Sequence, residues 1–167
     1  MYLSEDECRR LIAGAEQQPS PFLACRDKAL LTFMLFTGAR RGEVLNLSWG
    51  DVDLEQRTVR FVAAKGAKTR VLLLADDAAV ALTAWRDLRP ACNHGFVFTT
   101  PWGARLSRRG LSTALTRALQ AAGIEKPGTT PHKLRHSFAC LMLRNGADLD
   151  CLRACWGTHG WVRPGSI

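Results

Sequence analysis

The segment 22–36 constrains the fold most, because it predicts a helix that is apolar on most of its sides. Its second half contains Leu30, Leu31, Phe33, Met34 and Leu35. A helix that is hydrophobic all round has to be buried by other elements. We therefore expect this helix to lie at the centre of the molecule and to end at Thr37-Gly38, where glycine allows the chain to turn.

The rest of the chain predicts several further helices and one β-hairpin. Ser4 and Glu7 have the spacing of a capping box at the start of the first helix. Residues 58–62 and 70–74 alternate like strands, and the connection between them has Gly66 near its tip. Further helices are expected to start near 39 and to span about 76–88, 111–122 and 131–145, with a short one from 148 and a stub of strand at 96–98. The sequence thus predicts an α+β, mainly helical fold with a small antiparallel sheet packed at one side.

Length and charge limit the class of protein. The chain has 167 residues, 47% of them hydrophobic, which is enough for one folded domain with a substantial core. Its net charge of +8 indicates a polyanionic partner, with nucleic acid favoured over an acidic membrane surface. The sequence shows no apolar run long enough to span a membrane and no signal peptide, so we expect a soluble, cytoplasmic protein without a membrane partner.

Cysteine and histidine spacings do not predict a metal site. The six cysteines are scattered without pairing, which is typical of reduced thiols. His132 and His136 lie four residues apart on an expected helix, but lysine stands where the zinc-protease motif has glutamate. Cys151, Cys155 and His159 are also spaced by four, without a second cluster to complete a tetrahedron. We expect no metal, no other cofactor and no small-molecule substrate.

Three basic stretches lie at expected element boundaries, where rigid neighbours can hold functional groups. Arg40 starts a helix, Lys65 lies on the hairpin connection, and His132 and Arg135 share one face of the helical turn that Pro131 begins. Two guanidiniums can stabilise the charge that builds on a phosphodiester during displacement of an alkoxide. A lysine can protonate the leaving oxygen, and a histidine can assist proton transfer. Each residue alone could be a solvated surface charge, whereas together they predict a phosphodiester site.

The same stretches carry motifs of one family. The first box is Thr37-Gly38-Ala39-Arg40, followed by Glu43 and, further on, by 49–53. The hairpin reads Lys-Gly-x-Lys-x-Arg at 65–70, and the second box is Pro-His-x-Leu-Arg-His at 131–136. In these motifs the chain resembles the catalytic domain of the tyrosine recombinase (phage-type integrase) family, which cuts and rejoins DNA through a covalent phosphotyrosine. The resemblance extends over roughly 3–153, and we expect 1–153 to form an integrase-type catalytic domain.

The resemblance implies a role for each matching residue. Arg40 and Arg135 would clamp the scissile phosphate, while Lys65 would protonate the leaving 5′ oxygen and His132 would assist proton transfer. Glu43 would support the site, and His136 would be a more ordinary helix residue nearby. The implied partners are duplex DNA and other recombinase protomers assembled on it. Contacts to the DNA are expected from further basic side chains, namely Lys68, Arg70, Arg105, Arg108, Arg109 and Lys133.

The end of the chain departs from the family pattern. The family continues with Leu-Gly-His and has its nucleophilic tyrosine nine residues later, whereas the one tyrosine of this sequence is Tyr2. If the third bases of the codons are chosen suitably, the nucleotides that encode 155–167 can be read two bases further on. In that frame they can encode the missing Leu-Gly-His and the tyrosine nine residues later. We therefore expect 154–167 to be an aberrant tail produced by a frameshift, with a genuinely divergent tail as the alternative. His159 would then lie beside the family's histidine position by coincidence, although it could still reach the site.

Without the tyrosine, covalent strand cleavage is not expected, and other functions stay open. The chain could be a non-catalytic DNA-binding remnant or regulator, or a recombinase whose tyrosine comes from a neighbouring protomer. A metal-dependent nuclease or hydrolase is a further alternative, against which the scarcity of clustered carboxylates argues. Because the sequence begins at the catalytic domain, we also expect half of the family's DNA clamp to be missing and DNA binding to be weak and salt-dependent.

Overall fold

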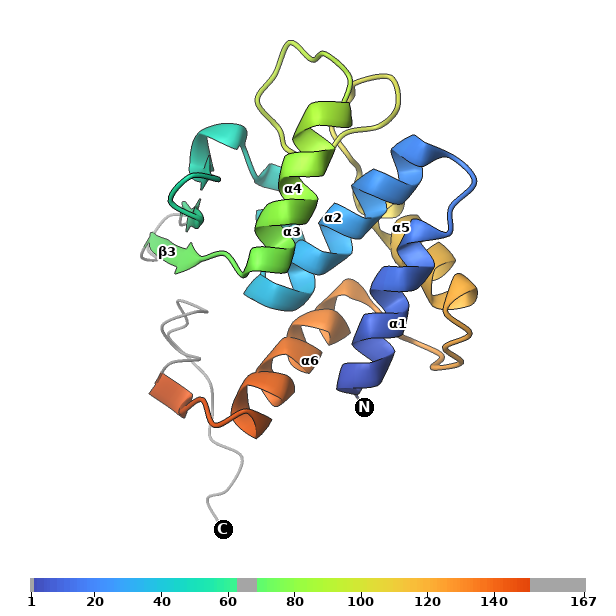
Figure 1. Cartoon of the computed structure of the whole chain (residues 1–167), viewed down its shortest axis with the longest axis vertical. Coiled ribbons are helices and arrows are strands. Elements are labelled where there is room, and N and C mark those ends of the chain that lie inside the picture. The colour runs from blue at the N-terminus through green and yellow to red at the C-terminus, as the bar shows by residue number, and fades with distance from the viewer. Residues whose placement is uncertain (1, 63–68, 151–167) are drawn as a thin grey trace.

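The structure, a computed structural model, describes residues 2–62 and 69–150. Helices make up most of this part of the chain, and one small sheet lies beside them (Figure 1). In order the elements are α1 (Glu5–Glu16), α2 (Pro21–Thr37), α3 (Arg41–Asn46), the 3₁₀ helix η1 (Trp49–Asp51), β1 (Val52–Asp53), β2 (Thr58–Phe61), β3 (Arg70–Leu73), α4 (Asp76–Leu88), α5 (Arg108–Ala121) and α6 (Pro131–Arg144). The mainly helical α+β fold expected from the sequence is confirmed.

Helix α2 occupies the centre of the molecule, and α1, α4, α5 and α6 pack against it (Figure 1). The Ser20 side chain caps its first turn by accepting a backbone N–H. Leu30, Leu31 and Phe33 have no exposed area, as expected for a helix that is apolar all round. The helix ends at Gly38, whose φ of 61° lies in the left-handed region. The direction in which the chain leaves α2 is therefore fixed by this glycine.

The sheet has three antiparallel strands in the order β1-β2-β3. In its β2–β3 hairpin, Phe61 pairs with Arg70 and Val59 with Leu72. Val59 and Phe61 are buried, and the Phe61 ring lies 6.1 Å from that of Phe33 in α2. The inward face of the hairpin is thus attached to the central helix, which fixes where β3 begins.

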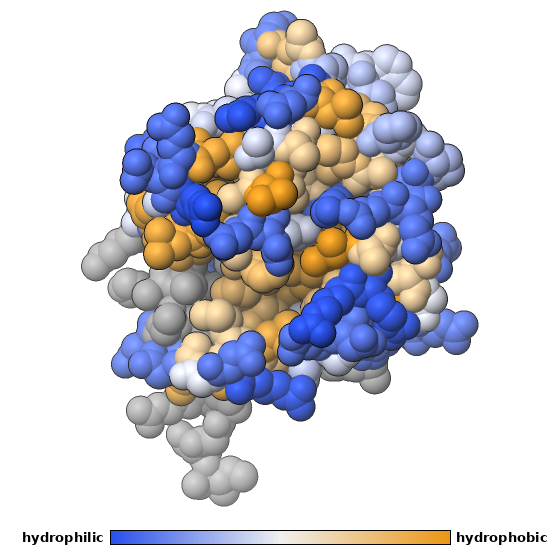
Figure 2. All heavy atoms as spheres, in the orientation of Figure 1, coloured by the Kyte–Doolittle hydropathy of each residue, from blue (hydrophilic) through white to orange (hydrophobic). Residues whose placement is uncertain are grey.

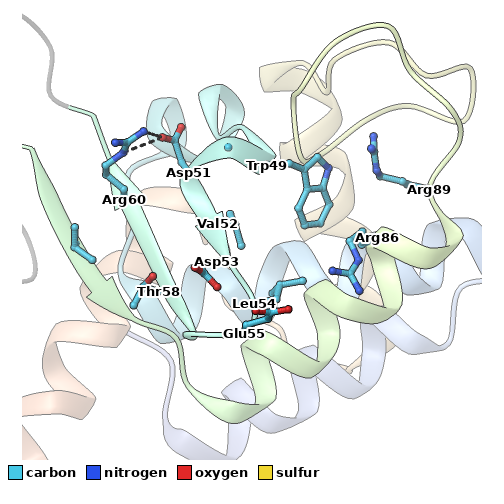
Figure 3. Close-up of a pocket in the computed structure, with 12 residues that line it drawn as sticks. Trp49, Asp51, Val52, Asp53, Leu54, Glu55, Thr58, Arg60, Arg86 and Arg89 are labelled. Carbon is cyan, nitrogen blue, oxygen red and sulfur yellow. Dashed lines mark hydrogen bonds and ion pairs between the residues drawn. The ribbon is translucent and has the colours of Figure 1, made fainter.

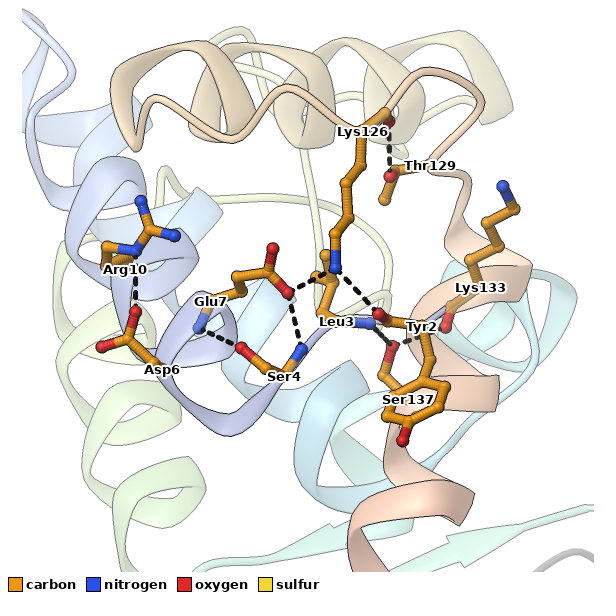
Figure 4. Close-up of polar contacts among 10 residues, drawn as sticks. All are labelled: Tyr2, Leu3, Ser4, Asp6, Glu7, Arg10, Lys126, Thr129, Lys133 and Ser137. Carbon is orange, nitrogen blue, oxygen red and sulfur yellow. Dashed lines mark hydrogen bonds and ion pairs between the residues drawn. The ribbon is translucent and has the colours of Figure 1, made fainter.

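The N-terminal segment is tied to α6 and to the loop before it (Figure 4). The Leu3 backbone N–H donates to Ser137 Oγ over 2.9 Å. Lys126 Nζ donates to the Tyr2 carbonyl over 3.1 Å and to Glu7 Oε2 over 2.6 Å. Ser4 and Glu7 form the expected capping box of α1. These contacts hold the start of the chain against one side of α6.

One face of the molecule leaves apolar side chains uncovered by the described residues. A hollow of about 920 Å³ lies between α1, β3 and α6, with walls that include Ile12, Phe36, Leu73 and Phe138. Figure 2 shows hydrophobic residues on this face between hydrophilic ones along its edges. Leu73 is 80% exposed and Phe36 39%.

No described helix has both the length and the hydropathy needed to cross a bilayer.

Candidate functional site

A basic cavity of about 450 Å³ opens where the chain enters α3, α5 and α6. Arg40, His132 and Arg135 line it together, although the first arginine is more than ninety residues from the other two in sequence. The described residues of its wall are Ala39, Arg40, Arg41, Gly42, Arg108, Thr130, Pro131, His132 and Arg135. The two arginines and the histidine that the sequence assigned to a phosphate site therefore share one cavity.

The turn after α2 places Arg40 at this cavity. Thr37 Oγ1 donates to the Phe33 carbonyl over 2.7 Å and accepts the Ala39 N–H over 3.2 Å. This side chain therefore stabilises both the last turn of α2 and the residues that follow it. Gly38 reverses the chain, and Arg40 emerges as the exposed residue that precedes α3.

Arg135 lines the cavity although most of the residue is buried. Only 7% of the residue is exposed, and its Nη1 donates to the Gly38 carbonyl, which links α6 to the turn that carries Arg40. Burial and the neighbouring charges of Arg40 and Arg70 lower the pKa of Arg135 to about 10, while Glu43 opposes this shift. The guanidinium is therefore still protonated at neutral pH, and a bound anion would stabilise this charged form.

Glu43 is the carboxylate of this arginine cluster. Arg70 Nη1 and Nη2 donate to its Oε1 and Oε2 over 2.7 and 2.9 Å, and the Arg40 N–H donates to Oε2 over 2.7 Å. Burial raises the pKa of Glu43, but the hydrogen bonds from Arg70 and Arg40 outweigh it and keep the pKa below its ordinary value. The single negative charge of Glu43 is thus smaller than the combined positive charge of Arg40, Arg70 and Arg135.

The arrangement suits a phosphate oxyanion. Excess positive charge that is partly withdrawn from water interacts strongly with an anion. Helix α6 adds the backbone N–H of His132 in its first turn, where a helix attracts negative charge. His132 is exposed within the same wall, where its imidazole can exchange a proton with a bound group. Among the described residues, no group of three His, Cys, Asp or Glu side chains is placed to hold a metal ion.

A model of the phage integrase family matches residues 1–159. The chain belongs to the phage integrase family. It is 34% identical to the tyrosine recombinase XerD of Listeria innocua over 161 residues, which cover 93% of the chain and 53% of that protein.

Solved structures of the family agree with this assignment. The XerA recombinase matches with a TM-score of 0.86 and 33% identity over 96% of the chain and 57% of that structure. The XerH recombinase bound to its difH substrate in a pre-cleavage complex matches with a TM-score of 0.79 and 27% identity, over 95% of the chain and 47% of that structure. The resemblance found in the sequence is confirmed. The chain spans about half the length of the curated relatives it matches.

Within this integrase fold, the basic residues expected at DNA occupy different positions. Arg108 and Arg109 are exposed at the start of α5, and Arg108 lines the cavity. Arg105 is held at the end of α3, where Nε donates to the Leu45 carbonyl over 2.9 Å. Arg70 is turned inward to Glu43. Their contacts with DNA stay predictions, with the clearest structural support for Arg108.

Two predicted residues of α6 lie away from the cavity. Lys133 lines a small crevice beside Tyr2 and Lys126, and the His136 ring packs at 6.5 Å from that of Tyr2. The Arg144 guanidinium also lies over the Tyr2 ring, 5.6 Å from its centroid. The single tyrosine therefore belongs to the N-terminal contact with α6 and is not among the described residues of the cavity wall.

Three predicted site residues, Lys65, Lys68 and His159, lie outside the described residues, as does the tail 154–167. Conversely, the cavity includes Arg41 and Thr130, which the sequence did not single out. Both are immediate neighbours of a predicted residue or of Pro131, so their adjacency to the two boxes was the available signal. Sequence alone does not tell which neighbour of a functional residue faces the same cavity.

Proposed function

We propose that this chain is the catalytic domain of a site-specific tyrosine recombinase and that its basic cavity binds a phosphodiester of duplex DNA. The observation that carries the proposal is the convergence of Arg40, Arg135 and His132 on one cavity. Membership of the phage integrase family supports it, as do the relatives, which are tyrosine recombinases and include one solved in complex with its DNA substrate. By the same proposal the chain acts in the cytoplasm, where the DNA of its bacterial relatives lies.

In this proposal each residue acts on the charge or protons of the phosphodiester. Arg40 and Arg135 bind the non-bridging oxygens, whose negative charge grows in the transition state. His132 assists proton transfer at the attacking oxygen, and Lys65 protonates the leaving 5′ oxygen. Arg108 extends the positive surface from the cavity to the flanking backbone. Glu43 supports the site by fixing the backbone of Arg40.

The proposal includes no covalent cleavage by this chain alone. Cleavage by the family chemistry requires a tyrosine nucleophile at the phosphate, and Tyr2 is packed against α6 and Arg144. A non-catalytic DNA-binding remnant is therefore the second candidate, and a tyrosine supplied by another protomer would distinguish the two. Binding of duplex DNA is common to both, whereas formation of a covalent adduct after mixing with a tyrosine-bearing partner belongs to the first alone.

Salt-dependent binding tests the cavity. We expect the wild-type chain to bind short duplexes weakly, and R40Q to lower the slope of log affinity against log salt by about 0.9, the contribution of one phosphate contact. R86Q is the matched control, because it removes one exposed arginine that lines a different hollow. Equal losses in R40Q and R86Q would mean that only the net charge matters and would contradict the proposed site.

A second experiment tests the tail. We propose that 1–153 is the integrase-type domain and that 154–167 results from a frameshift. The nucleotide sequence from the codon of Arg153 past that of Ile167 should contain, in another frame, Leu-Gly-His and a tyrosine nine residues further on. Restoring that frame should then yield a covalent DNA adduct that a gel resolves. A gene in which no frame encodes this ending would contradict the frameshift.

A further inference from the structure

Arg70 has the position of a structural link between two parts of the site. It is the first residue of β3, and its guanidinium forms a bidentate ion pair with Glu43, 27 residues earlier in the chain. The side chains are only 11% and 18% exposed. The guanidinium carbon also lies 4.5 Å from the centroid of the Phe61 ring, in the strand residue that pairs with Arg70. Two planar contacts therefore fix this guanidinium in place.

The partner of Arg70 also fixes the arginine of the first box. Glu43 Oε2 accepts both Arg70 Nη2 over 2.9 Å and the Arg40 backbone N–H over 2.7 Å. A single carboxylate thus joins the start of β3 to the residue that precedes α3. Helix α3 has six residues, which is too short to be stable without outside contacts. The position of Arg40 therefore depends on a contact made from the hairpin.

Neither Arg70 nor Glu43 is among the described residues that line the cavity. The Arg70 charge is largely balanced by Glu43, and its donors point inward to that carboxylate. A DNA phosphate would have to compete with a short bidentate ion pair to bind this guanidinium. The geometry does not favour the direct DNA contact that the sequence suggested for Arg70.

We propose that Arg70 is a positioning residue, which holds Arg40 and the base of the β2–β3 hairpin in register through Glu43. This inference rests on the proposed phosphate site. It assigns to Arg70 a geometric role that a lysine cannot fill, because an ammonium lacks the planar pair of donors that matches a carboxylate. The charge of Arg70 alone does not suffice for the role.

The test compares R70K, which keeps the charge, with R70Q, which removes it. The probe is inorganic phosphate, titrated against the arginine side-chain NMR signals of the whole chain at a temperature where every variant is folded. We expect both variants to weaken phosphate binding by about tenfold, the equivalent of one hydrogen bond to a charged group. If R70K binds phosphate like the wild type while R70Q is weakened, Arg70 acts through its charge and the positioning role is overturned.

R60Q is the matched control. Arg60 lies on the neighbouring strand and pairs with Asp51, with Nη2 and Oδ1 3.0 Å apart, but 56% of its side chain is exposed (Figure 3). It lines a hollow between the sheet and α4, away from the arginine cavity. We expect R60Q to bind phosphate like the wild type. A loss in R60Q as large as that in R70K would overturn the assignment to this particular ion pair.

Amide hydrogen exchange without any ligand separates failure of this inference from failure of the proposed function. In R70K we expect faster exchange at the Val44 N–H, which bonds to the Arg40 carbonyl, and no change at the Ala79 N–H in α4. A merely structural role would accelerate both through global unfolding. Equal changes at the two amides, or none at Val44, would overturn the positioning role whether or not the chain binds phosphate or DNA.

Discussion

Gly38 determines the backbone conformation after α2 and also helps to position Arg135 in the site. Its φ of 61° is strained for any residue with a Cβ, and its carbonyl accepts the hydrogen bond from Arg135. The same residue therefore ends the central helix and connects the two arginine-bearing segments. Its place in the Thr-Gly-x-Arg motif follows from this geometry.

Replacing Gly38 by alanine should accordingly be costly. We expect G38A to lower the free energy of unfolding by about 1–2 kcal/mol, because alanine disfavours the left-handed conformation. G42A is the control, since an added Cβ there meets no atom within 4 Å and alanine is the better helix former in α3. Urea denaturation measures both. A G38A variant as stable as G42A would show that the turn can relax without this glycine.

For single residues, the sequence predicted which residues belong to the site better than it predicted where their side chains point. Arg40, His132 and Arg135 were predicted because they lie at two expected helix starts and in the two boxes of the family. Arg70 could not be distinguished from a DNA-facing cation, since the Lys-Gly-x-Lys-x-Arg pattern reads as a uniformly basic hairpin. Only the tertiary fold brings Glu43 beside it and turns it inward.

At the scale of the elements, the contact between α3 and the β2–β3 hairpin depends on the ionisation of Glu43. The pKa of Glu43 lies below its ordinary value near 4.5 in the folded protein. A lowered pKa means that the ionised carboxylate stabilises the fold above that value, and that the stabilisation is lost as the pH falls through the folded pKa. The pair with Arg70 should therefore weaken in acid.

The variant E43Q isolates this contribution. At pH 7 we expect E43Q to be less stable than the wild type by about 1.5–3 kcal/mol, because a charged hydrogen-bond acceptor of Arg70 is lost. Below pH 4.5 the difference should shrink, since the carboxyl of the unfolded wild-type chain then takes up a proton and that of the folded protein follows at its lower pKa. Urea unfolding at pH 7, 5, 4 and 3 measures it. A difference that stays constant down to pH 3 would contradict the lowered pKa.

Most elements were predictable from the sequence because their periodicity and end signals agree. The helix over 76–88 matches α4, α2 is one residue longer at each end than expected, and α6 starts as expected and ends one residue earlier. Helix α5 starts three residues earlier than expected, since Ser107 caps it by accepting the Gly110 N–H. The two-residue β1 was missed, and the expected stub at 96–98 has only an isolated bridge between Phe96 and Ser48. Both depend on pairing across the chain, which local patterns do not contain.

At the scale of the whole molecule, the central helix carries a charged pair inside the core. Arg26 and Asp27 are 3% and 0% exposed, and Arg26 Nε and Nη2 donate to Asp27 Oδ1 over 2.8 and 2.7 Å. Arg26 Nη1 also donates to the Thr99 carbonyl over 3.2 Å, and Arg117 Nη2 of α5 lies 3.5 Å from Asp27 Oδ2. This cluster ties α2 to α5 and to the loop before it, which leads to the cavity-lining start of α5.

Removing one partner of the pair should destabilise the entire domain. We expect D27A to lower the free energy of unfolding by about 3–5 kcal/mol, because it leaves the Arg26 charge buried without its carboxylate. E16A is the control, since the Glu16–Lys28 pair also joins two helices but is half exposed and should contribute less than about 1 kcal/mol. Urea unfolding measures both variants. The double variant R26M/D27L should be more stable than D27A, because it also removes the buried charge of Arg26, whereas Arg117 loses its carboxylate in both variants and is 32% exposed. A D27A effect no larger than that of E16A would mean that water reaches Arg26, and that the cluster does not hold α5 in place.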